Sequence, residues 1–220
     1  MSQRVKHFDK VACKKLLQQG LKAMTFNAQE QQLNQSIDYL EMMHTWNQRL
    51  NLTAIRDPLE MVSRHLLDSL SIYPHVMGDS VIDVGTGAGL PGIPLAIMMP
   101  QKQFFLLDSN HKKQVFVSQV AKLLSLKNVH CIHSEVKAYQ PTEKFSTIVT
   151  RAFAPLSQMI ELTNHLLAQD GRFLAMMGKV EENFSLPKGF ELEHMVSLSV
   201  PGEIAQRHLG IIARAGAHSL

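Results

Sequence analysis

A glycine-rich segment that directly follows a short apolar run constrains the fold of this chain most strongly. Residues 81–92 read VIDVGTGAGLPG, and a helical pattern follows them. A strand that passes through a glycine-rich turn into a helix is typical of the ligand-binding turn in a doubly wound α/β sheet. Glycine allows positive φ angles and lets a ligand approach the backbone closely. The alternative is a turn without a ligand, although four glycines in eight residues exceed what a tight turn requires.

The residues around these glycines favour one ligand over another. Gly87, Gly89 and Gly92 match the dinucleotide fingerprint G-x-G-x-x-G, but that match alone is weak. Asp83 precedes the glycines, and a carboxylate there suits a cationic ligand group rather than a pyrophosphate. S-adenosylmethionine carries an α-ammonium group and no phosphate, so the pattern favours it. Asp108 ends the next apolar run, where an acid meets ribose hydroxyls in this class of fold, and capping the following helix is its alternative role.

The hydrophobic pattern changes near residue 78 and predicts two parts. Before it, apolar residues recur every three or four positions from Leu33 to Leu50, and Asp57-Pro58 begins another helix. After it, short apolar runs alternate with helical stretches, which indicates a parallel sheet with helices on both faces. The expected strands are 81–84, 103–107, 129–133, 146–150 and 172–176, then an antiparallel pair at 190–200 and 208–214, and the expected helices are 92–99, 111–125 and 155–167.

These elements predict a Rossmann-like α/β fold with a mixed sheet of about seven strands and helices on both faces. We expect residues 1–78 to form an N-terminal helical segment packed on a catalytic domain of residues 79–220. The first 22 residues are rich in lysine and arginine, and their spacing favours a solvated amphipathic helix over a transit peptide.

The composition excludes several classes of protein. Hydrophobic residues make up 45% of the chain and charged residues 19%, which rules out a mostly disordered chain. Cys13 and Cys131 both lie in apolar runs, so we expect buried thiols in a reducing compartment. No apolar stretch approaches the ~20 residues of a membrane span. Because no signal peptide is visible either, we expect a cytoplasmic protein.

Basic residues at several places are candidates for contact with the substrate. His111, Lys112 and Lys113 begin a helix, where cations oppose the macrodipole, so the alternatives are phosphate contact and a solvated face. Arg151 follows a strand at its carboxyl end, where open α/β sheets bind ligands. The remaining candidates are Arg64, His65, Arg207 and His208. The histidines show no spacing typical of a metal site, so we expect no metal.

These motifs together resemble the RsmG family, also called glucose-inhibited division protein B. The resemblance covers nearly the whole chain from about residue 25 and rests on Trp46–Asn47, Asn51–Thr53, Arg64–Leu70, Asp83–Pro94, Leu107–Ser109, Arg151–Ala154 and Arg207–Leu209. It implies a class I methyltransferase that uses S-adenosylmethionine, yields S-adenosylhomocysteine and methylates N7 of a specific guanine in 16S ribosomal RNA. The implied partner is this RNA or the small ribosomal subunit, with no membrane, and we expect a monomer.

The resemblance also implies cofactor contacts. They fall on Gly85 and Leu90 in the loop, on Val136 and Lys137 after the third strand, and on Arg151. The family usually has a basic residue where this chain has Glu135 and an acidic one where it has Lys137. A contact through the backbone would survive this exchange of charges, whereas a contact through the side chain would not.

The implied chemistry needs alignment more than acid–base catalysis, because guanine N7 carries a lone pair and no proton. No residue is expected with certainty to be catalytic, and Arg64, His65 and Arg151 are candidates to orient the base. Three alternatives remain open at this point. The first is a methyltransferase that acts on a protein or a small molecule, and the second is a non-catalytic module that binds ribosomal RNA. The third is a Rossmann dehydrogenase, which the glycines alone would allow.

Overall fold

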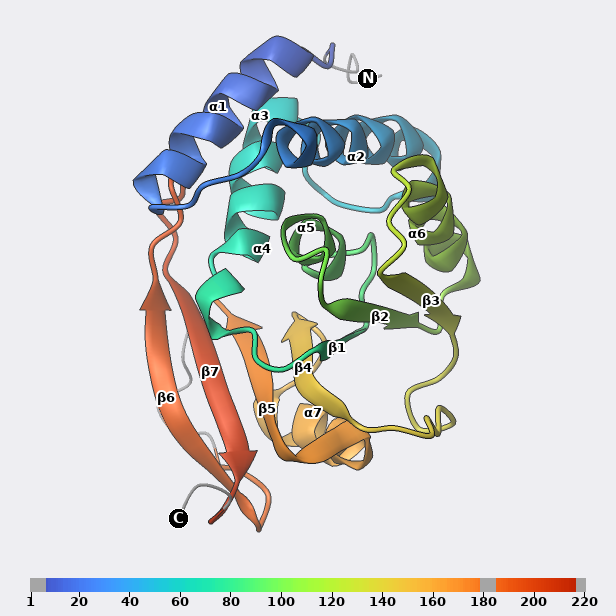
Figure 1. The fold of residues 1–220 in the computed structure, drawn as a ribbon, viewed down its shortest axis with the longest axis vertical. Helices are drawn as coiled ribbons and strands as arrows, with labels where there is room; N and C mark the ends of the chain where they lie inside the picture. Colours follow the sequence, from blue (N-terminus) through green and yellow to red (C-terminus); the bar gives the residue numbers. More distant parts are fainter. Residues whose placement is uncertain (1–6, 179–184, 217–220) are drawn as a thin grey trace.

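A seven-stranded sheet forms the centre of the computed structural model, which describes residues 7–178 and 185–216 (Figure 1). The strand order is β3-β2-β1-β4-β5-β7-β6. Strands β1 to β5 are parallel, and β7 is antiparallel to both β5 and β6. The bounds are β1 Ser80–Val84, β2 Gln103–Asp108, β3 Val129–His133, β4 Phe145–Arg151, β5 Leu167–Met177, β6 Phe190–Leu198 and β7 Arg207–Arg214. The expected mixed sheet with a final antiparallel pair is confirmed.

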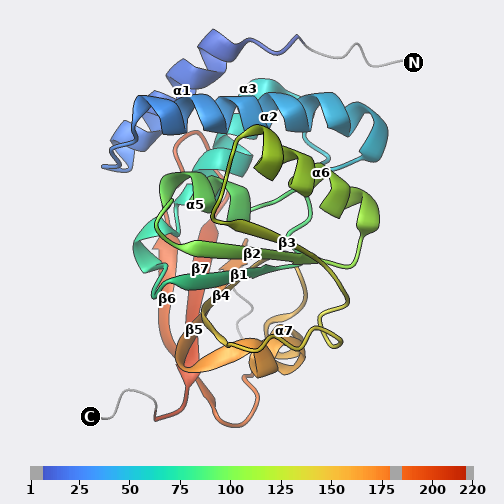
Figure 2. The same cartoon turned by 45° about the vertical axis from the view of Figure 1, so that its right-hand side comes forward.

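Helices cover both faces of the sheet, as expected, but unequally. The N-terminal helices, α5 and α6 lie on one face, and α7 lies on the other (Figures 1 and 2). The helices are α1 Lys10–Ala23, α2 Glu30–Leu50, α3 Pro58–Met61, the π-helix η1 Val62–Leu67, α4 Asp68–Leu70, the 3₁₀-helix η2 Tyr73–His75, α5 Gly92–Met98, α6 His111–Leu123, α7 Leu156–Thr163 and the 3₁₀-helix η3 Asn164–Leu166.

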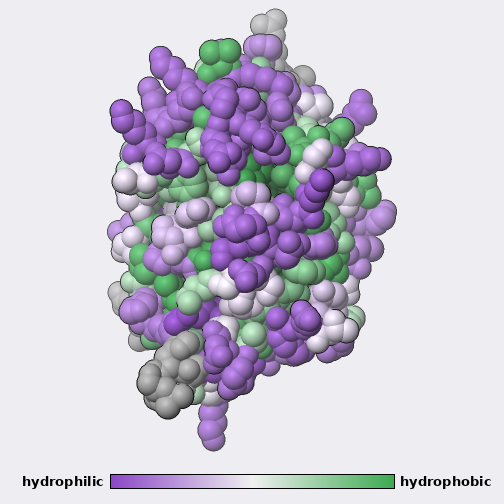
Figure 3. Space-filling model, viewed as in Figure 1, coloured by the Kyte–Doolittle hydropathy of each residue, from purple (hydrophilic) through white to green (hydrophobic). Residues whose placement is uncertain are grey.

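The alternation of side chains along each central strand explains the two layers. Val81 of β1 joins a hydrophobic core with residues of α1, α2, α5 and α6. Its neighbour Ile82 points to the opposite face and packs with Met159 and Ile160 of α7. The face drawn in Figure 3 is mostly hydrophilic, with small apolar patches between the polar side chains. Within the described residues, no helix is both long and apolar enough to cross a membrane.

The N-terminal helices share a core with the sheet. Leu17 and Leu40 lie in the same cluster as Ile93 and Phe116. The fully buried Tyr39 of α2 donates a hydrogen bond to the carbonyl of Ala88 in the glycine-rich loop, at 2.8 Å. The N-terminal segment therefore contacts the backbone of the loop itself.

The helix that begins after Asp57 starts as expected and then changes its geometry. The Asp57 carboxylate accepts a hydrogen bond from the backbone N–H of Leu59 at 2.8 Å, and Pro58 occupies the first turn. From Val62 to Leu67 the chain forms a π-helix, which the hydrophobic spacing did not indicate. Such π-helical turns are rare and are frequently found at functional sites.

Two expected boundaries are wrong. The helix expected over 155–167 ends at Thr163, because a 3₁₀ turn follows it. Strand β5 then begins at Leu167 rather than 172, where Leu167 pairs with Phe145 ahead of an irregularity in the register. Of the two cysteines, Cys13 is buried as expected, whereas Cys131 is only half-buried, and both are free thiols.

Candidate functional site

The glycine-rich loop joins β1 to α5 and presents an open backbone. Gly85, Gly87 and Gly89 have φ angles of 71°, 61° and 92°. These values lie in the left-handed region that favours glycine. A Cβ added at Gly87 would find only the Gly85 carbonyl oxygen nearby, at 3.8 Å, whereas one at Gly92 would collide with Leu106. Gly87 therefore leaves room beside the loop for a ligand, and Gly92 allows close packing of α5 on the sheet.

Asp83 holds this loop from inside. Its Oδ2 accepts hydrogen bonds from the Gly92 backbone N–H at 2.9 Å and from the Thr86 hydroxyl at 2.7 Å. The side chain is fully buried, and this burial raises the pKa of its carboxyl group to about 7. The expectation that this carboxylate meets a cationic ligand directly needs correction, because the side chain is closed to solvent and is engaged by the loop.

Asp108 connects the end of β2 to the same loop. Its Oδ2 accepts from the Gly87 backbone N–H, and its Oδ1 accepts from the Asn110 backbone N–H, both at 2.8 Å. The cap of α6 is Asn110, whose side chain accepts from the Lys113 backbone N–H at 3.2 Å. The alternative role of Asp108 as the helix cap is therefore wrong. Its half-buried carboxylate lies beside the open part of the loop.

The remaining cofactor candidates lie on the loop and after β3. Leu90 is half-buried in the loop, and Val136 is half-buried after β3 and packs on the second core cluster. Glu135 and Lys137, which depart from the family pattern, are both exposed. The basic residues that open α6 follow Asp108 closely along the chain. His111 and Lys112 are exposed and Lys113 is half-buried.

Five charged side chains meet where β4 ends and β7 begins. The Asp68 carboxylate contacts Arg151 Nε at 3.3 Å and Arg207 Nε at 2.9 Å. Arg207 also donates to Glu203 at 3.2 Å, and Arg64 lies 3.6 Å from the second oxygen of Glu203. The structure thus brings together three arginines that are far apart in the sequence, and two acids that the sequence did not single out.

His65 lies inside this region rather than on its surface. Only 3% of the residue is exposed, so the expectation that its ring meets RNA directly needs correction. Its Nδ1 lies 3.0 Å from the Arg64 carbonyl oxygen. Because a carbonyl only accepts, Nδ1 carries the proton, and Nε2 accepts from the Thr53 hydroxyl at 2.9 Å. Burial, followed by the charge of Arg151, lowers the pKa of His65 to about 4.

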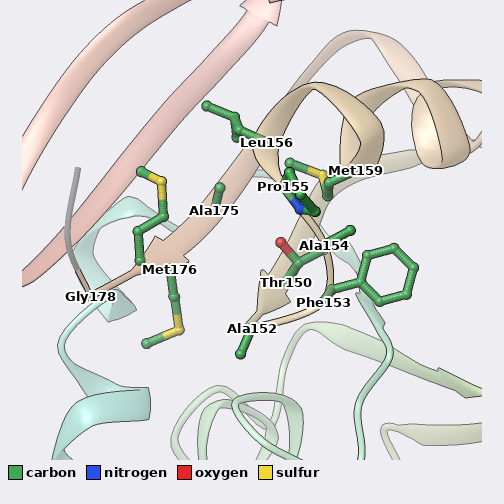
Figure 4. Close-up of a pocket in the computed structure, with 11 residues that line it drawn as sticks. Thr150, Ala152, Phe153, Ala154, Pro155, Leu156, Met159, Ala175, Met176 and Gly178 are labelled. Atoms are coloured by element: carbon green, nitrogen blue, oxygen red, sulfur yellow. The ribbon is translucent and has the colours of Figure 1, made fainter. Parts of the chain in front are cut away.

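Two adjoining cavities open at the carboxyl ends of β4 and β5. One, of about 240 Å³, is lined by the segment after β4, by α7 and by the end of β5 (Figure 4). The other, of about 170 Å³, is lined by Asp68, Arg151 and Arg207 among others, and His208 also borders it. They share Ala152, Met176, Met177 and Gly178. The methionines were missed from the sequence because, at the end of a buried strand, they look like ordinary core residues.

Phe153 connects the larger cavity to the glycine-rich loop. It lines the cavity, and a Cβ added at Gly85 would lie 2.5 Å from its ring. The neighbouring Ala152 has a φ of 52°, an unfavourable value for a residue other than glycine that is often found at functional sites. A ligand on the loop and a second molecule in the cavity would therefore lie side by side.

Comparisons with known proteins agree with this architecture. The family model described as rRNA small subunit methyltransferase G matches residues 32–210. A relative of that name from Marinobacter nauticus is 48% identical over 204 residues, which cover 92% of this chain and 95% of the relative. Another, from Pseudomonas paraeruginosa, is 50% identical over 184 residues, with 82% and 86% covered.

The fold is shared with a solved structure that is described as an S-adenosylmethionine-dependent methyltransferase from Aquifex aeolicus. It has a TM-score of 0.55 and 17% sequence identity and covers 74% of this chain and 96% of its own. At this identity the likeness concerns the fold alone. The length of the family match and the identity to the curated relatives together establish which family the chain belongs to. The chain belongs to the GidB family, rRNA small subunit methyltransferase G.

Proposed function

We propose that this protein transfers the methyl group of S-adenosylmethionine to N7 of a guanine in 16S ribosomal RNA. The observation that carries the proposal is the open glycine-rich loop, which is tied to Asp108 and packs against Phe153, a residue that also lines the cavity at the ends of β4 and β5. This arrangement provides neighbouring places for a methyl donor and an acceptor. Family membership supports the reaction and the RNA.

The residues present fit this cofactor. The open position of the loop at Gly87 admits a ligand against the backbone, Leu90 flanks it, and the half-buried Asp108 offers a carboxylate for ribose hydroxyls. When bound, S-adenosylmethionine supplies an electrophilic methyl group on a sulfonium. We further assign Val136 and Lys137 to the adenosine side and Arg151 to the cofactor side. Asp83 acts indirectly, because it holds the loop in shape.

The protein residues have the task of aligning the acceptor. Guanine presents O6 and N7 as adjacent acceptors, for which arginine is the natural partner. Arg151, Arg207 and the more exposed Arg64 surround the smaller cavity or lie next to it. His208 lines the same cavity and donates through Nδ1 to the Gly178 carbonyl at 3.0 Å. His65 acts indirectly, because its Nδ1 donates a hydrogen bond to the backbone carbonyl of Arg64. Met176 and Met177 line both cavities, and methionine side chains adapt to flat apolar surfaces such as that of a base.

Methyl transfer to ribosomal RNA can be tested directly. Small ribosomal subunits from cells without the gene are incubated with the protein and labelled S-adenosylmethionine, and the modified nucleotide is located by mass spectrometry. We expect one methylated guanine in 16S RNA, with the label on N7. Label in protein or in small molecules instead would favour the first alternative. RNA affinity without binding of S-adenosylmethionine would favour the non-catalytic module.

We propose that the protein acts in the cytoplasm as a monomer on the small ribosomal subunit. We also propose that residues 1–78 serve the catalytic part, residues 79–220, as a support rather than as an independent unit. The hydrogen bond from Tyr39 to the Ala88 carbonyl and the shared core support this division.

The lysines that open α6 are expected to act on RNA and not on the cofactor. Replacing Lys112 and Lys113 with alanine should weaken RNA binding and reduce its salt slope by about one per lysine, because fewer counterions are released. Affinity for S-adenosylmethionine should change little. The matched control replaces Lys122 and Lys127, two exposed lysines near the other end of the same helix. Equal salt slopes in both double variants would show that Lys112 and Lys113 are merely solvated.

His65 is expected to leave the pH dependence of methylation unchanged. Its pKa of about 4 keeps the ring neutral from mildly acidic to basic pH, so it cannot act by gaining or losing a proton there. Single-turnover rates at saturating cofactor and RNA should give profiles of the same shape for the wild type and His65→Ala, although the variant is slower. A limb near pH 7 that persists in the variant would belong to another group, and burial raises the pKa of Asp83 to about 7. The ordinary pKa of histidine is about 6.5. An acidic limb at that pH that disappears in His65→Ala would disprove this expectation.

A further inference from the structure

We propose that Asp68 is a positioning residue that holds Arg151 and Arg207 together at the wall of the smaller cavity. This inference rests on the proposed function. Asp68 follows directly after the π-helix, whereas its two partners come from the end of β4 and the start of β7. Each oxygen of its carboxylate contacts a different arginine, at 3.3 Å and 2.9 Å. Three distant parts of the chain therefore converge on one carboxylate.

Burial makes this carboxylate important for the geometry of both arginines. Only 3% of the Asp68 side chain is exposed, against 24% and 21% for those of Arg151 and Arg207. Charges that are removed from water need a close partner, because little solvent screens them. Without the charge of Asp68, Glu203 would be the one acid of this cluster left beside three arginines, so mutual repulsion would push Arg151 and Arg207 apart.

The contacts of Arg151 fix which of its donors remains available. Its Nε faces Asp68, and its Nη2 donates to the Arg64 carbonyl within the π-helix at 2.9 Å. Its Nη1 is buried and has no hydrogen-bond partner in the structure. An unsatisfied buried donor is costly, so this group is suited to an acceptor atom of a bound molecule. Asp68 and the π-helix together hold the guanidinium so that Nη1 is the donor left without a partner, on a residue that lines the smaller cavity.

A second ion pair in the same sheet shows what a structural role alone would look like. Arg172 of β5 donates to both oxygens of Glu193 in β6. It lies beside Thr147, whereas Met176, farther along β5, lies beside Arg151. The Arg172 pair is therefore displaced along the strands toward the end away from the smaller cavity, which Arg151 lines. Its removal should affect stability and leave methylation alone.

The test is a double-mutant cycle measured as single-turnover methylation of small subunits at saturating cofactor. Asp68→Asn should slow the reaction by about tenfold to hundredfold, because small displacements of aligning groups have effects of this size. Adding Asp68→Asn to a variant that carries both Arg151→Gln and Arg207→Gln should slow it little further, since Asp68 acts through the two arginines that are already missing. Multiplying effects in that combined variant would overturn the proposal. So would a wild-type rate in Asp68→Asn. Glu193→Gln is the matched control and should keep the wild-type rate.

Two further measurements keep the result interpretable. If Asp68→Asn does not fold, Asp68→Glu retains the charge and moves the carboxylate by one methylene. A slower rate in the folded Glu variant then supports positioning, and a wild-type rate overturns it. The wild type is measured first: if it methylates no RNA, the proposed function fails and this inference falls with it. If the wild type methylates RNA and the Asp68 variants do so at the same rate, the inference alone is refuted.

Discussion

Gly87→Val is expected to abolish binding of S-adenosylmethionine while the protein remains folded. A Cβ at Gly87 would find nothing closer than the Gly85 carbonyl oxygen at 3.8 Å, so the fold has room for it. That same room is where the ligand must approach. The positive φ of 61° adds a strain of roughly 1–2 kcal/mol for any other residue, which will further distort the loop. We expect affinity to fall by at least about 100-fold, or ~2.7 kcal/mol.

Calorimetric titration with S-adenosylmethionine, together with thermal unfolding, separates a lost site from a lost fold. The matched control is Gly189→Val, because Gly189 has a similarly positive φ of 89° and open space around it, and it lies in the turn before β6. This control should carry comparable backbone strain and retain normal cofactor affinity. Near-normal affinity in a folded Gly87→Val protein would contradict the assignment of the loop.

Asp108→Ala is expected to weaken cofactor binding by about 10- to 100-fold. A hydrogen bond to a charged group contributes roughly 1.5–3 kcal/mol, and the bond from the ribose would be lost. The variant also removes the acceptor for the Gly87 backbone N–H, so the loop loses its link to β2. Both losses act on the same binding step.

A graded series distinguishes these two contributions. Asp108→Asn keeps a carbonyl oxygen that can accept from Gly87 and removes the charge, so its affinity should lie between those of the wild type and Asp108→Ala. Asp170→Ala, at an exposed carboxylate of β5, should bind normally. The same titrations measure all four proteins. If Asp108→Ala binds as tightly as the wild type, the carboxylate contributes to cofactor binding neither through the ribose nor through the loop.

The cofactor side of this site could be predicted from the sequence because its parts are close together in the chain. The glycines, Asp83 and Asp108 lie within one β–α–β unit, and turn chemistry and strand ends are readable locally. Even there, one role was wrong in detail, since the burial of Asp83 depends on how α5 packs against β1. The strands were predicted for a similar reason, because each is a short apolar run with clear ends.

The acceptor side could not be predicted in the same way. Arg64, Arg151 and Arg207 were candidates only one by one, because nothing local says that they share a cluster. Asp68 was quoted within a motif without a role, since its partners come from other segments. The π-helix was likewise not indicated by the hydrophobic spacing, because its 6 residues are too few to show a period different from that of an α-helix.

The contact between Asp68 and Arg207 joins residues 139 positions apart, and it sets an order of events during synthesis. The glycine-rich loop and Asp108 are translated well before β7. A growing chain can therefore possess every residue of the loop while Arg207 has not yet been made. The arginine pair assembles only after β7 has left the ribosome and paired with β5 and β6. A chain that ends before β7 therefore lacks one of the two arginines that Asp68 holds in the finished protein, and with it part of the RNA site proposed above.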